Sequence, residues 1–360
     1  MKRKLPIIVV LMFMTIAPQA QDQATPAAVA LRIRRDDAER RALFLSTDPL
    51  PITLEADFGL VLKDRDPNST KVYPAVVRLG SPEDSKEIPV QLSVRGHSRR
   101  LSTTCEFVPL RLEFPKDATR GTVFEMRASG LKLVTHCRGS REHQQYVLRE
   151  YLAYRIANIL TPRSFRARLA TATYVDSAKG KTLTTRYAIF LEDDDDVARR
   201  MEGKIRDDRG TLYNKLHQEA LNQMMIFEFM IANTDYSIIN LHNIRIVETA
   251  SGEAYAVPYD FDLSGLVNTP YAVPNPRLRL KAATDRLYRG PCRTPEQLAP
   301  ALDTFRATKK EVLDLVQSLP DLNTAVRTEM KKFLNEFYSL IDRPSGVRRY
   351  LIEPCVKMGI

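Results

Sequence analysis

Long hydrophobic runs are scarce in this chain of 360 residues. Apart from residues 5–16, no apolar stretch approaches the roughly 20 residues that a transmembrane helix needs, so no membrane span is expected. Compositional extremes are absent too, because 44% of the residues are hydrophobic and 27% are charged, which excludes wholesale disorder, collagen and coiled coil. The length favours about two domains, or one large domain with two lobes.

Several motifs of known chemistry are also missing. The 5 histidines are scattered without HExxH spacing, which argues against a zinc site. Neither Ser98 nor Ser237 stands in a G-x-S-x-G setting, and no G-x-G-x-x-G marks a nucleotide-binding glycine loop. The pairs Arg99-Arg100 and Arg199-Arg200 are short and lack interleaved aromatic residues, so no nucleic-acid partner is expected.

The N-terminus has the pattern of a secretory signal peptide. Lys2, Arg3 and Lys4 precede the apolar run 5–16, and small and polar residues follow at 17–21. We expect cleavage after Ala20, which removes residues 1–20 and lowers the net charge of +10 by three. The protein is therefore predicted to be exported, to a periplasmic or extracellular location.

The four cysteines are too far apart for a zinc ribbon or a CxxC redox motif. Outside the cytoplasm an even number favours disulfides, for which three connectivities are possible. We expect Cys105–Cys137 and Cys292–Cys355, because these pairs stay within the two halves described next. Free buried cysteines are the alternative.

The first half of the chain is rich in strand patterns. Residues 21–48 form an N-terminal extension with a possible helix over 27–45, and residues 49–191 form a β-rich lobe. Within that lobe a helix is predicted over 145–160, where Thr161-Pro162 ends an apolar stripe. Short runs rich in Val, Ile and Leu predict strands at 52–56, 73–79, 88–94, 110–114, 168–175 and 185–191.

The second half, residues 192–360, is predicted to be mainly helical. Apolar residues recur at helical spacing over 216–231 and 326–341, and Thr294-Pro295-Glu296-Gln297 is typical of a helix start. The acidic run 193–196 is expected to be a solvated loop. The overall class is therefore α+β, with a β-rich N-terminal lobe and a mainly helical C-terminal lobe.

One predicted hairpin interrupts the helical half and contains the candidate chemistry. Strands at 243–247 and 254–258 flank a turn at 249–252, whose centre lies near residues 250–251. Antiparallel pairing places equidistant residues opposite one another, so Asn240 is expected beside Asp260, with Asp235 upstream. Oxygen ligands of this kind suit Mg²⁺ and bound phosphates, and a nearby carboxylate can deprotonate a hydroxyl.

These segments resemble a known family. Asn233-Thr234-Asp235 followed by Asn240, and then Tyr259-Asp260-Phe261-Asp262, are similar to the catalytic segments of the kinase-like superfamily in its CotH (spore-coat kinase) and HipA branches. The resemblance extends to Arg95-Gly96-His97-Ser98 and to Tyr187–Glu192, and covers residues 86–265. It implies a bilobal protein-kinase-like fold that uses ATP and Mg²⁺.

The resemblance also implies a role for each matching residue. Asp235 would be the catalytic base, and three residues, Asn240, Asp260 and Asp262, would hold Mg²⁺. Phosphates would be bound by Arg95 and Gly96, and Glu192 would lie at the adenine hinge. The family's lysine is missing from residues 107–111, so Lys132 is the substitute that we predict, with Glu150 as its partner.

The sequence thus predicts an exported, Mg-dependent kinase-like phosphotransferase that moves the γ-phosphate of a nucleotide to a hydroxyl of a protein or envelope component. A catalytically inactive binding module for an anionic envelope partner is the alternative. A third interpretation takes Asp235 and Asn240 as helix-cap and turn residues, and Asp260 and Asp262 as a strand end or a structural Ca²⁺ site. In that interpretation Lys132 lies on a solvent-facing edge strand, and Glu150 is a solvated helix residue.

Overall fold

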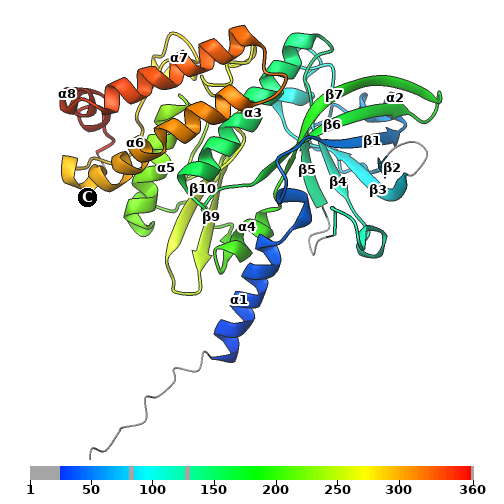
Figure 1. The fold of residues 1–360 in the computed structure, drawn as a ribbon, viewed down its shortest axis with the longest axis horizontal. Helices are drawn as coiled ribbons and strands as arrows, with labels where there is room; N and C mark the ends of the chain where they lie inside the picture. Colours follow the sequence, from blue (N-terminus) through cyan, green and yellow to red (C-terminus); the bar gives the residue numbers. More distant parts are fainter. Residues whose placement is uncertain (1–24, 81–84, 126–129, 358–360) are drawn as a thin grey trace, which may run out of the picture.

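A computed structural model describes residues 25–80, 85–125 and 130–357 of the chain. The predicted signal peptide, residues 1–20, lies outside the described residues. The fold has two parts that meet along a central helix: a β-barrel made by the first half of the chain, and a group of helices with a small sheet made by the second half (Figure 1).

The first part is a closed barrel of seven strands in the order β1-β2-β3-β4-β5-β7-β6. Neighbouring strands are antiparallel except β1 and β6, which run parallel, with Leu54 paired to Tyr174. The strands are β1 (Leu50–Ala56), β2 (Tyr73–Leu79), β3 (Lys86–Val94), β4 (Leu110–Glu113), β5 (Gly130–Val134), β6 (Ala167–Asp176) and β7 (Lys181–Leu191). Each of the six strands predicted for this half is present, with boundaries shifted by a few residues.

The barrel closes over its own hydrophobic core. Alternate residues of its strands point inward, as in β3, where Ile88, Val90 and Leu92 are buried and the residues between them are exposed. Phe58, on the short helix α2 (Phe58–Val61), fills one end and packs edge-on against Tyr174. Burial on this scale provides most of the stability of the barrel.

The bilobal protein-kinase-like fold that the resemblance implied is wrong. The strands of the first half form a closed mixed barrel, and three strands of the second half form a separate sheet, β10-β9-β8. The physical reason is the parallel pairing of β1 with β6, which joins strands more than 100 residues apart and leaves no open sheet edge.

Helix α3 (Arg141–Leu160) lies between the barrel and the helical part (Figure 1). It extends the predicted helix by four residues at its N-terminus and is buried on several faces, because it packs on β6 and β7 and on helix α6. Helix α1 (Pro26–Glu39) packs on α4 through its C-terminal end, and its N-terminal end projects away from the rest of the chain (Figure 1).

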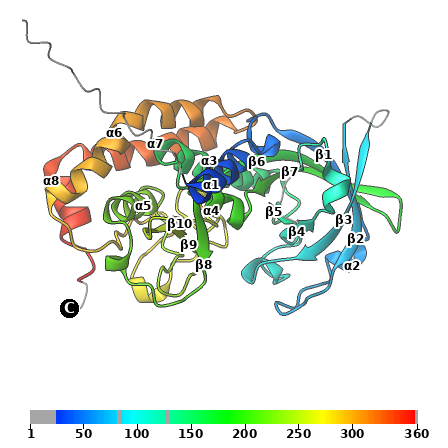
Figure 2. The same ribbon diagram turned by 90° about the horizontal axis from the view of Figure 1, so that it is seen from below.

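The second half is mainly helical, and its helices lie on the side of α3 away from the barrel (Figure 2). The capping box predicted at Thr294 and Gln297 is confirmed, with both reciprocal hydrogen bonds present. No helix in the described ranges combines the length and the apolar character needed to cross a membrane. The elements are α4 (Asp194–Arg200), β8 (Gly203–Arg206), α5 (Gln218–Met230), β9 (Ile244–Thr249), β10 (Ala254–Pro258), α6 (Pro295–Ser318), α7 (Thr324–Ile341) and α8 (Pro344–Val347).

Both predicted disulfides are confirmed. Cys105 is bonded to Cys137 and Cys292 to Cys355, with sequence separations of 32 and 63. Each bridge stays within one half of the chain, as expected. Two disulfides are characteristic of a protein that folds in an oxidising environment.

Candidate active site

The predicted hairpin exists, but its register differs from the expected one. Strands β9 and β10 pair with Glu248 opposite Ala254 and Ile244 opposite Pro258, and the Tyr259 N–H donates to the Asn243 carbonyl at 3.0 Å. The turn is therefore centred on Ser251, slightly later than predicted. The small shift brings Asn243, and not Asn240, to the end of the hairpin beside the segment that contains Asp260.

A cavity of about 380 Å³ opens at this end of the hairpin. Its walls come from the barrel, through Arg95, Gly96 and Lys132, and from the second half of the chain, through Asp235 and Asp260. The remaining lining residues that matter below are Arg99, His242, Asn243, Arg245, Tyr259, Asp262 and Leu263. Asn240, Glu150 and Glu192 are not among the residues that line it.

Asp235 is oriented by two neighbours from the same loop. Its Oδ1 lies 3.0 Å from His242 Nε2, and Asn243 Nδ2 donates both to Oδ2 at 3.0 Å and to the Asp235 carbonyl at 2.8 Å. The hydrogen bond to Asp235 raises the pKa of His242. The Asn243 amide is thereby fixed with its nitrogen toward Asp235, and its Oδ1 has no hydrogen bond to any of the described residues.

Asp260 is held in a left-handed backbone conformation, with φ of 65°. For a residue other than glycine this conformation costs about 1–3 kcal/mol and is common at functional sites. Its peptide N–H donates to the Tyr154 hydroxyl at 2.9 Å, and the next residue, Phe261, is fully buried between Tyr154 and Phe227. This anchoring directs a partly exposed carboxylate into the cavity, where Asp260 Oδ2 lies 4.0 Å from the Arg95 guanidinium.

Asp262 is the buried member of the acidic group. Tyr271 donates its hydroxyl proton to Asp262 Oδ2 at 3.1 Å, and Thr269 donates to the Asp262 carbonyl at 3.0 Å. Burial and the negative charge of Asp260 raise the pKa of Asp262 to about 7, against an opposing contribution from Arg99. The carboxylate therefore changes charge near neutral pH, and a nearby cation would lower its pKa again.

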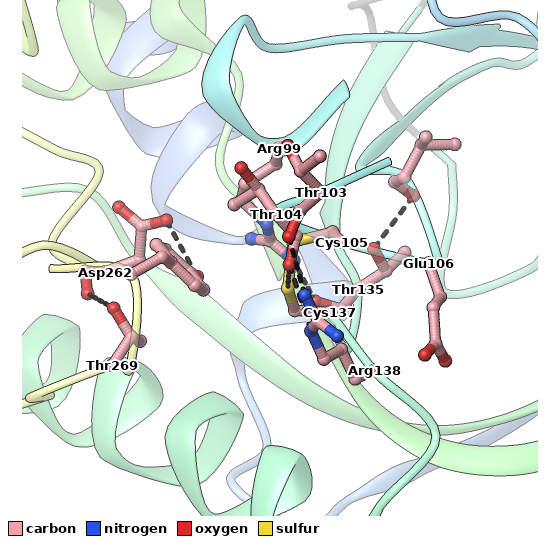
Figure 3. Close-up of a disulfide and its surroundings, with 12 residues drawn as sticks. Arg99, Thr103, Thr104, Cys105, Glu106, Thr135, Cys137, Arg138, Asp262 and Thr269 are labelled. Atoms are coloured by element: carbon pink, nitrogen blue, oxygen red, sulfur yellow. Dashed lines mark hydrogen bonds between the residues drawn. A yellow bond between two sulfur atoms is a disulfide. The ribbon is translucent and has the colours of Figure 1, made fainter. Parts of the chain in front are cut away.

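Arg99 lies next to the Cys105–Cys137 disulfide, with Asp262 on its other side (Figure 3). It belongs to a short 3-10 turn (Ser98–Arg100) and is buried, with its guanidinium donating to the Thr135 carbonyl. The disulfide joins the loop after this turn to the segment that follows β5, where Glu106 N–H and Phe107 N–H both donate to the Cys137 carbonyl. The bridge thus fixes the barrel-side wall of the cavity.

Gly96 permits the turn that begins this wall. Its φ is +83°, in the left-handed region that favours glycine, and a side chain there would approach the Pro109 ring at 3.8 Å. The preceding Arg95 N–H donates to the Pro109 carbonyl at 3.0 Å. Arg95 and Gly96 are therefore both held at the cavity.

Lys132 lines the cavity, but its partner is not Glu150. Its Nζ lies 2.6 Å from Asp194 Oδ1 and 4.7 Å from the centre of the Tyr259 ring. Arg245 approaches the same two residues, with Nε donating to Asp194 Oδ2 at 2.7 Å and its guanidinium 4.8 Å from the Tyr259 ring. Burial lowers the pKa of Lys132, and the Asp194 charge opposes that effect. Asp194 thus holds two cations against one aromatic face.

Glu150 lies below the cavity floor on α3 and is neither solvated nor paired with Lys132. Its side chain is 2% exposed, and Oε1 has no hydrogen-bond partner among the described residues. Burial raises its pKa well above the usual value, and the charges of Asp262 and Asp260 raise it further. The surroundings of Glu150 therefore favour its protonated form.

Glu192 lies away from the cavity in an ion-pair network of its own. Arg166 and Arg200 donate to its two carboxylate oxygens at 2.7 to 3.0 Å, and the Arg166 N–H donates at 2.9 Å. Its side chain is completely buried. Because protein donors satisfy both of its carboxylate oxygens, Glu192 acts as the centre of an internal ion-pair network.

The structure therefore brings together six of the nine predicted site residues at one cavity and leaves out Asn240, Glu150 and Glu192. The sequence analysis missed Asn243, Arg245, His242 and Asp194. The sequence did contain an indication of Asn243. It is the first residue of the predicted strand, where the pairing of the hairpin begins. The acidic run containing Asp194 is helix α4 rather than the expected solvated loop.

The oxygen donors of the cavity are few. No group of three or more His, Cys, Asp or Glu side chains within the described ranges is arranged to hold a metal. Asp260 and Asp262 supply two carboxylates at the cavity, and Asn243, which lines the same cavity, has an amide oxygen. One or two carboxylates, completed by water and phosphate oxygens, are a usual protein contribution to a Mg²⁺ site, so these residue types are compatible with that ion.

Neither a protein-family model nor a curated protein matches this chain.

Proposed function

We propose that the protein is an exported phosphotransferase, which moves the γ-phosphate of a nucleotide such as ATP to a hydroxyl of a protein or envelope component. One observation supports this best: oxygen ligands and cations line a single cavity. Asp235, Asn243 and Asp260 come from the second half of the chain, and Arg95 and Lys132 come from the barrel. Phosphoryl transfer depends mainly on positioning and on neutralising phosphate charge, and this arrangement provides both.

Each group has a role in the proposed step. The acceptor hydroxyl oxygen attacks the γ-phosphorus, the bond from that phosphorus to the β–γ bridging oxygen breaks, and the nucleoside diphosphate leaves with the bond electrons. The hydroxyl proton passes to a carboxylate oxygen of Asp235, which His242 and Asn243 hold in one orientation. Arg95 and Lys132 bind phosphate oxygens from the barrel side.

A bound Mg²⁺ would neutralise charge on the phosphate oxygens during transfer. Asn243, Asp260 and Asp262 are the residues that would hold it. Asp262 would do so as a carboxylate, because a cation at the site favours its ionised form despite burial. Arg99, buried beside Asp262, would limit the negative charge that accumulates at the cavity floor.

The sharpest test compares two asparagines three positions apart. Asn243→Ala removes the amide that orients Asp235 and is expected to lower kcat/KM for phosphate transfer by about 100-fold or more, within the range for loss of a positioned polar group. Asn240→Ala, the matched control, changes a residue outside the cavity and is expected to leave the rate within about twofold. Transfer of radiolabelled γ-phosphate to generic protein acceptors measures both.

The prediction fails if the two alanine variants have equal rates. Asp235→Asn provides a second criterion, because it preserves shape while removing the proton acceptor, and is expected to reduce transfer by about 100-fold or more. Normal activity of Asp235→Asn contradicts the proposed function directly. Unchanged melting temperatures in all three variants show that folding is not the cause.

The second candidate is an inactive binding module for an anionic envelope partner. The observation that favours it is the cationic wall, where Arg95, Lys132 and Arg245 face one cavity. Isothermal titration with Mg-ATP separates the two functions. Heat of binding at millimolar nucleotide supports the phosphotransferase, and its absence supports the binding module.

A further inference from the structure

We infer that the acceptor is an acidic, hydroxyl-bearing polypeptide segment, and that it binds in a second cavity on the far side of Asp235. This inference rests on the proposed function, because it assigns the acceptor of that same site. The experiment below distinguishes its failure from the failure of the proposed function.

The second cavity has a volume of about 420 Å³ and shares residues with the first. Asp235 and Leu263 line both cavities. The other walls are formed by Thr234, Ala283 and the segment 273–276. An acceptor hydroxyl in this cavity therefore reaches Asp235 without passing through the space assigned to the phosphates.

The lining suits an extended polypeptide. Apart from Asp235 it contains no charged side chain, and the apolar residues Leu263, Val273, Pro274, Pro276 and Ala283 stand beside the polar Thr234 and Asn275. Val273 is 77% exposed, and neither its peptide N–H nor its carbonyl takes part in a hydrogen bond among the described residues. Open peptide groups at an exposed residue can pair with the backbone of an extended chain.

The segment that leads from Pro276 to Ala283, two lining residues of this cavity, is positively charged. This segment, called the rim, contains Arg277, Arg279 and Lys281, and all three side chains are exposed. None of them forms an ion pair with another described residue. The carboxylate that contacts this segment, Asp285, accepts hydrogen bonds from the peptide N–H groups of Lys281 and Ala282. Three cations on the rim therefore complement acidic residues that flank the acceptor hydroxyl.

The experiment uses the full mature chain and three serine peptides of equal length. Acidic, neutral and basic residues flank the serine in the respective peptides. With Mg-ATP, kcat/KM for the acidic peptide is expected to exceed that for the neutral peptide by about tenfold, and the basic peptide is expected to be the poorest acceptor. Fluorescence anisotropy of the same peptides without nucleotide measures binding independently of transfer.

The combined variant Arg277→Gln, Arg279→Gln and Lys281→Gln is expected to abolish the preference for the acidic peptide in both measurements. Its matched control is Arg32→Gln, Arg34→Gln and Arg40→Gln, on helix α1 and at its C-cap, where three exposed arginines give the same change in net charge away from both cavities. The control is expected to keep the preference. A preference that survives in the rim variant overturns the inference, as does equal binding of all three peptides.

Other outcomes separate the two proposals. If the acidic peptide binds through the rim but receives no phosphate, the surface assignment stands and the proposed function falls. If neutral peptides receive phosphate as fast as acidic ones, the proposed function stands and this inference falls. Phosphate transfer to an anionic polysaccharide with none to any peptide also overturns it.

Discussion

Two glutamates of this protein are both almost inaccessible to water, yet their surroundings differ in kind. Glu192 is at 0% exposure and Glu150 at 2%. Two arginines and a peptide N–H donate hydrogen bonds to the Glu192 carboxylate, which satisfies both oxygens. Glu150 has an oxygen without a hydrogen-bond partner among the described residues and two further carboxylates nearby.

The difference indicates which buried charge stabilises the fold and which belongs to a ligand site. A buried carboxylate surrounded by donors forms a closed network that repays its loss of hydration. A buried carboxylate that lacks such donors lowers stability, and such groups concentrate at functional sites. Only the surroundings of Glu150 extend, through Asp260 and Asp262, to the cavity.

The largest change in the free energy of unfolding is expected from Glu192→Ala. The change removes the carboxylate that pairs with the buried guanidinium of Arg200 and with the half-buried Arg166, and breaking such a pair typically costs about 3–5 kcal/mol in the free energy of unfolding. Urea denaturation followed by circular dichroism measures it.

Glu353→Ala is the control, because Glu353 is exposed and its contact with Arg348, at 3.3 Å, is a surface ion pair. Its effect is expected to stay below about 1 kcal/mol. If Glu192→Ala costs no more than this control, Glu192 does not have the structural role that its contacts indicate.

Glu150→Gln is expected to raise the free energy of unfolding, by an amount that depends on pH. Because burial raises the Glu150 pKa in the folded state, the folded state holds a proton that the unfolded state releases above its own, lower pKa. The wild-type free energy of unfolding therefore falls as pH rises from the unfolded pKa toward the folded one. Glutamine cannot ionise, so the variant is expected to lose part of this fall.

Urea denaturation at pH 4 and pH 8 checks this prediction. The variant is expected to match the wild type within about 0.5 kcal/mol at pH 4 and to exceed it by more than about 1 kcal/mol at pH 8, since one pKa unit corresponds to about 1.4 kcal/mol. Glu142→Gln is the control, because Glu142 is exposed near the start of the same helix, and it is expected to change the free energy of unfolding by less than about 0.5 kcal/mol. Parallel pH curves for wild type and Glu150→Gln would contradict the assignment.

Local sequence patterns predicted most of the helices and strands, but they did not predict that the strands close into a barrel. Alternation gave the strands of the barrel, the cap residues gave the start of α6, and the division into halves gave the disulfides. The parallel pairing of β1 with β6 left no trace in the pattern, because it depends on contacts between residues far apart in the chain. A barrel and an open sheet have the same alternation, and so the kinase-like fold class was wrong.

The sequence also brought most of the candidate site residues to one cavity, for a similar reason. Counting along a hairpin places two segments together, and Asp235 and Asp260 do line one cavity. Counting residues cannot fix the register of the hairpin. A small error in the position of the turn centre is enough to predict Asn240 at the site in place of Asn243. Side-chain partners such as Asp194 for Lys132 depend on packing between elements 62 positions apart, which no spacing rule provides.

The smallest change in the free energy of unfolding is expected from Asp194→Asn. This substitution tests whether a third carboxylate both stabilises the fold, like Glu192, and belongs to the cavity, like the surroundings of Glu150. Asp194 is satisfied, like Glu192, because Lys132 and Arg245 contact its two oxygens at 2.6 and 2.7 Å, but these cations face the cavity. Its side chain is 26% exposed, so the substitution is expected to cost only about 1 kcal/mol in the free energy of unfolding.

The stronger consequence of Asp194→Asn concerns the Lys132 amine. The Asp194 charge opposes the effect of burial on the Lys132 pKa, so its removal lowers that pKa further, and the amine loses its proton at a lower pH. Nucleotide affinity measured by calorimetry from pH 6 to pH 10 should then begin to fall at a lower pH in Asp194→Asn than in the wild type. Asp195→Asn is the matched control, because the neighbouring carboxylate is 68% exposed and its ion pair within the described residues is a long one, with Arg199 at 3.8 Å. Identical pH profiles for the two variants would mean that Asp194 stabilises helix α4 alone, as Glu192 stabilises its own surroundings, and does not tune the cationic wall of the cavity.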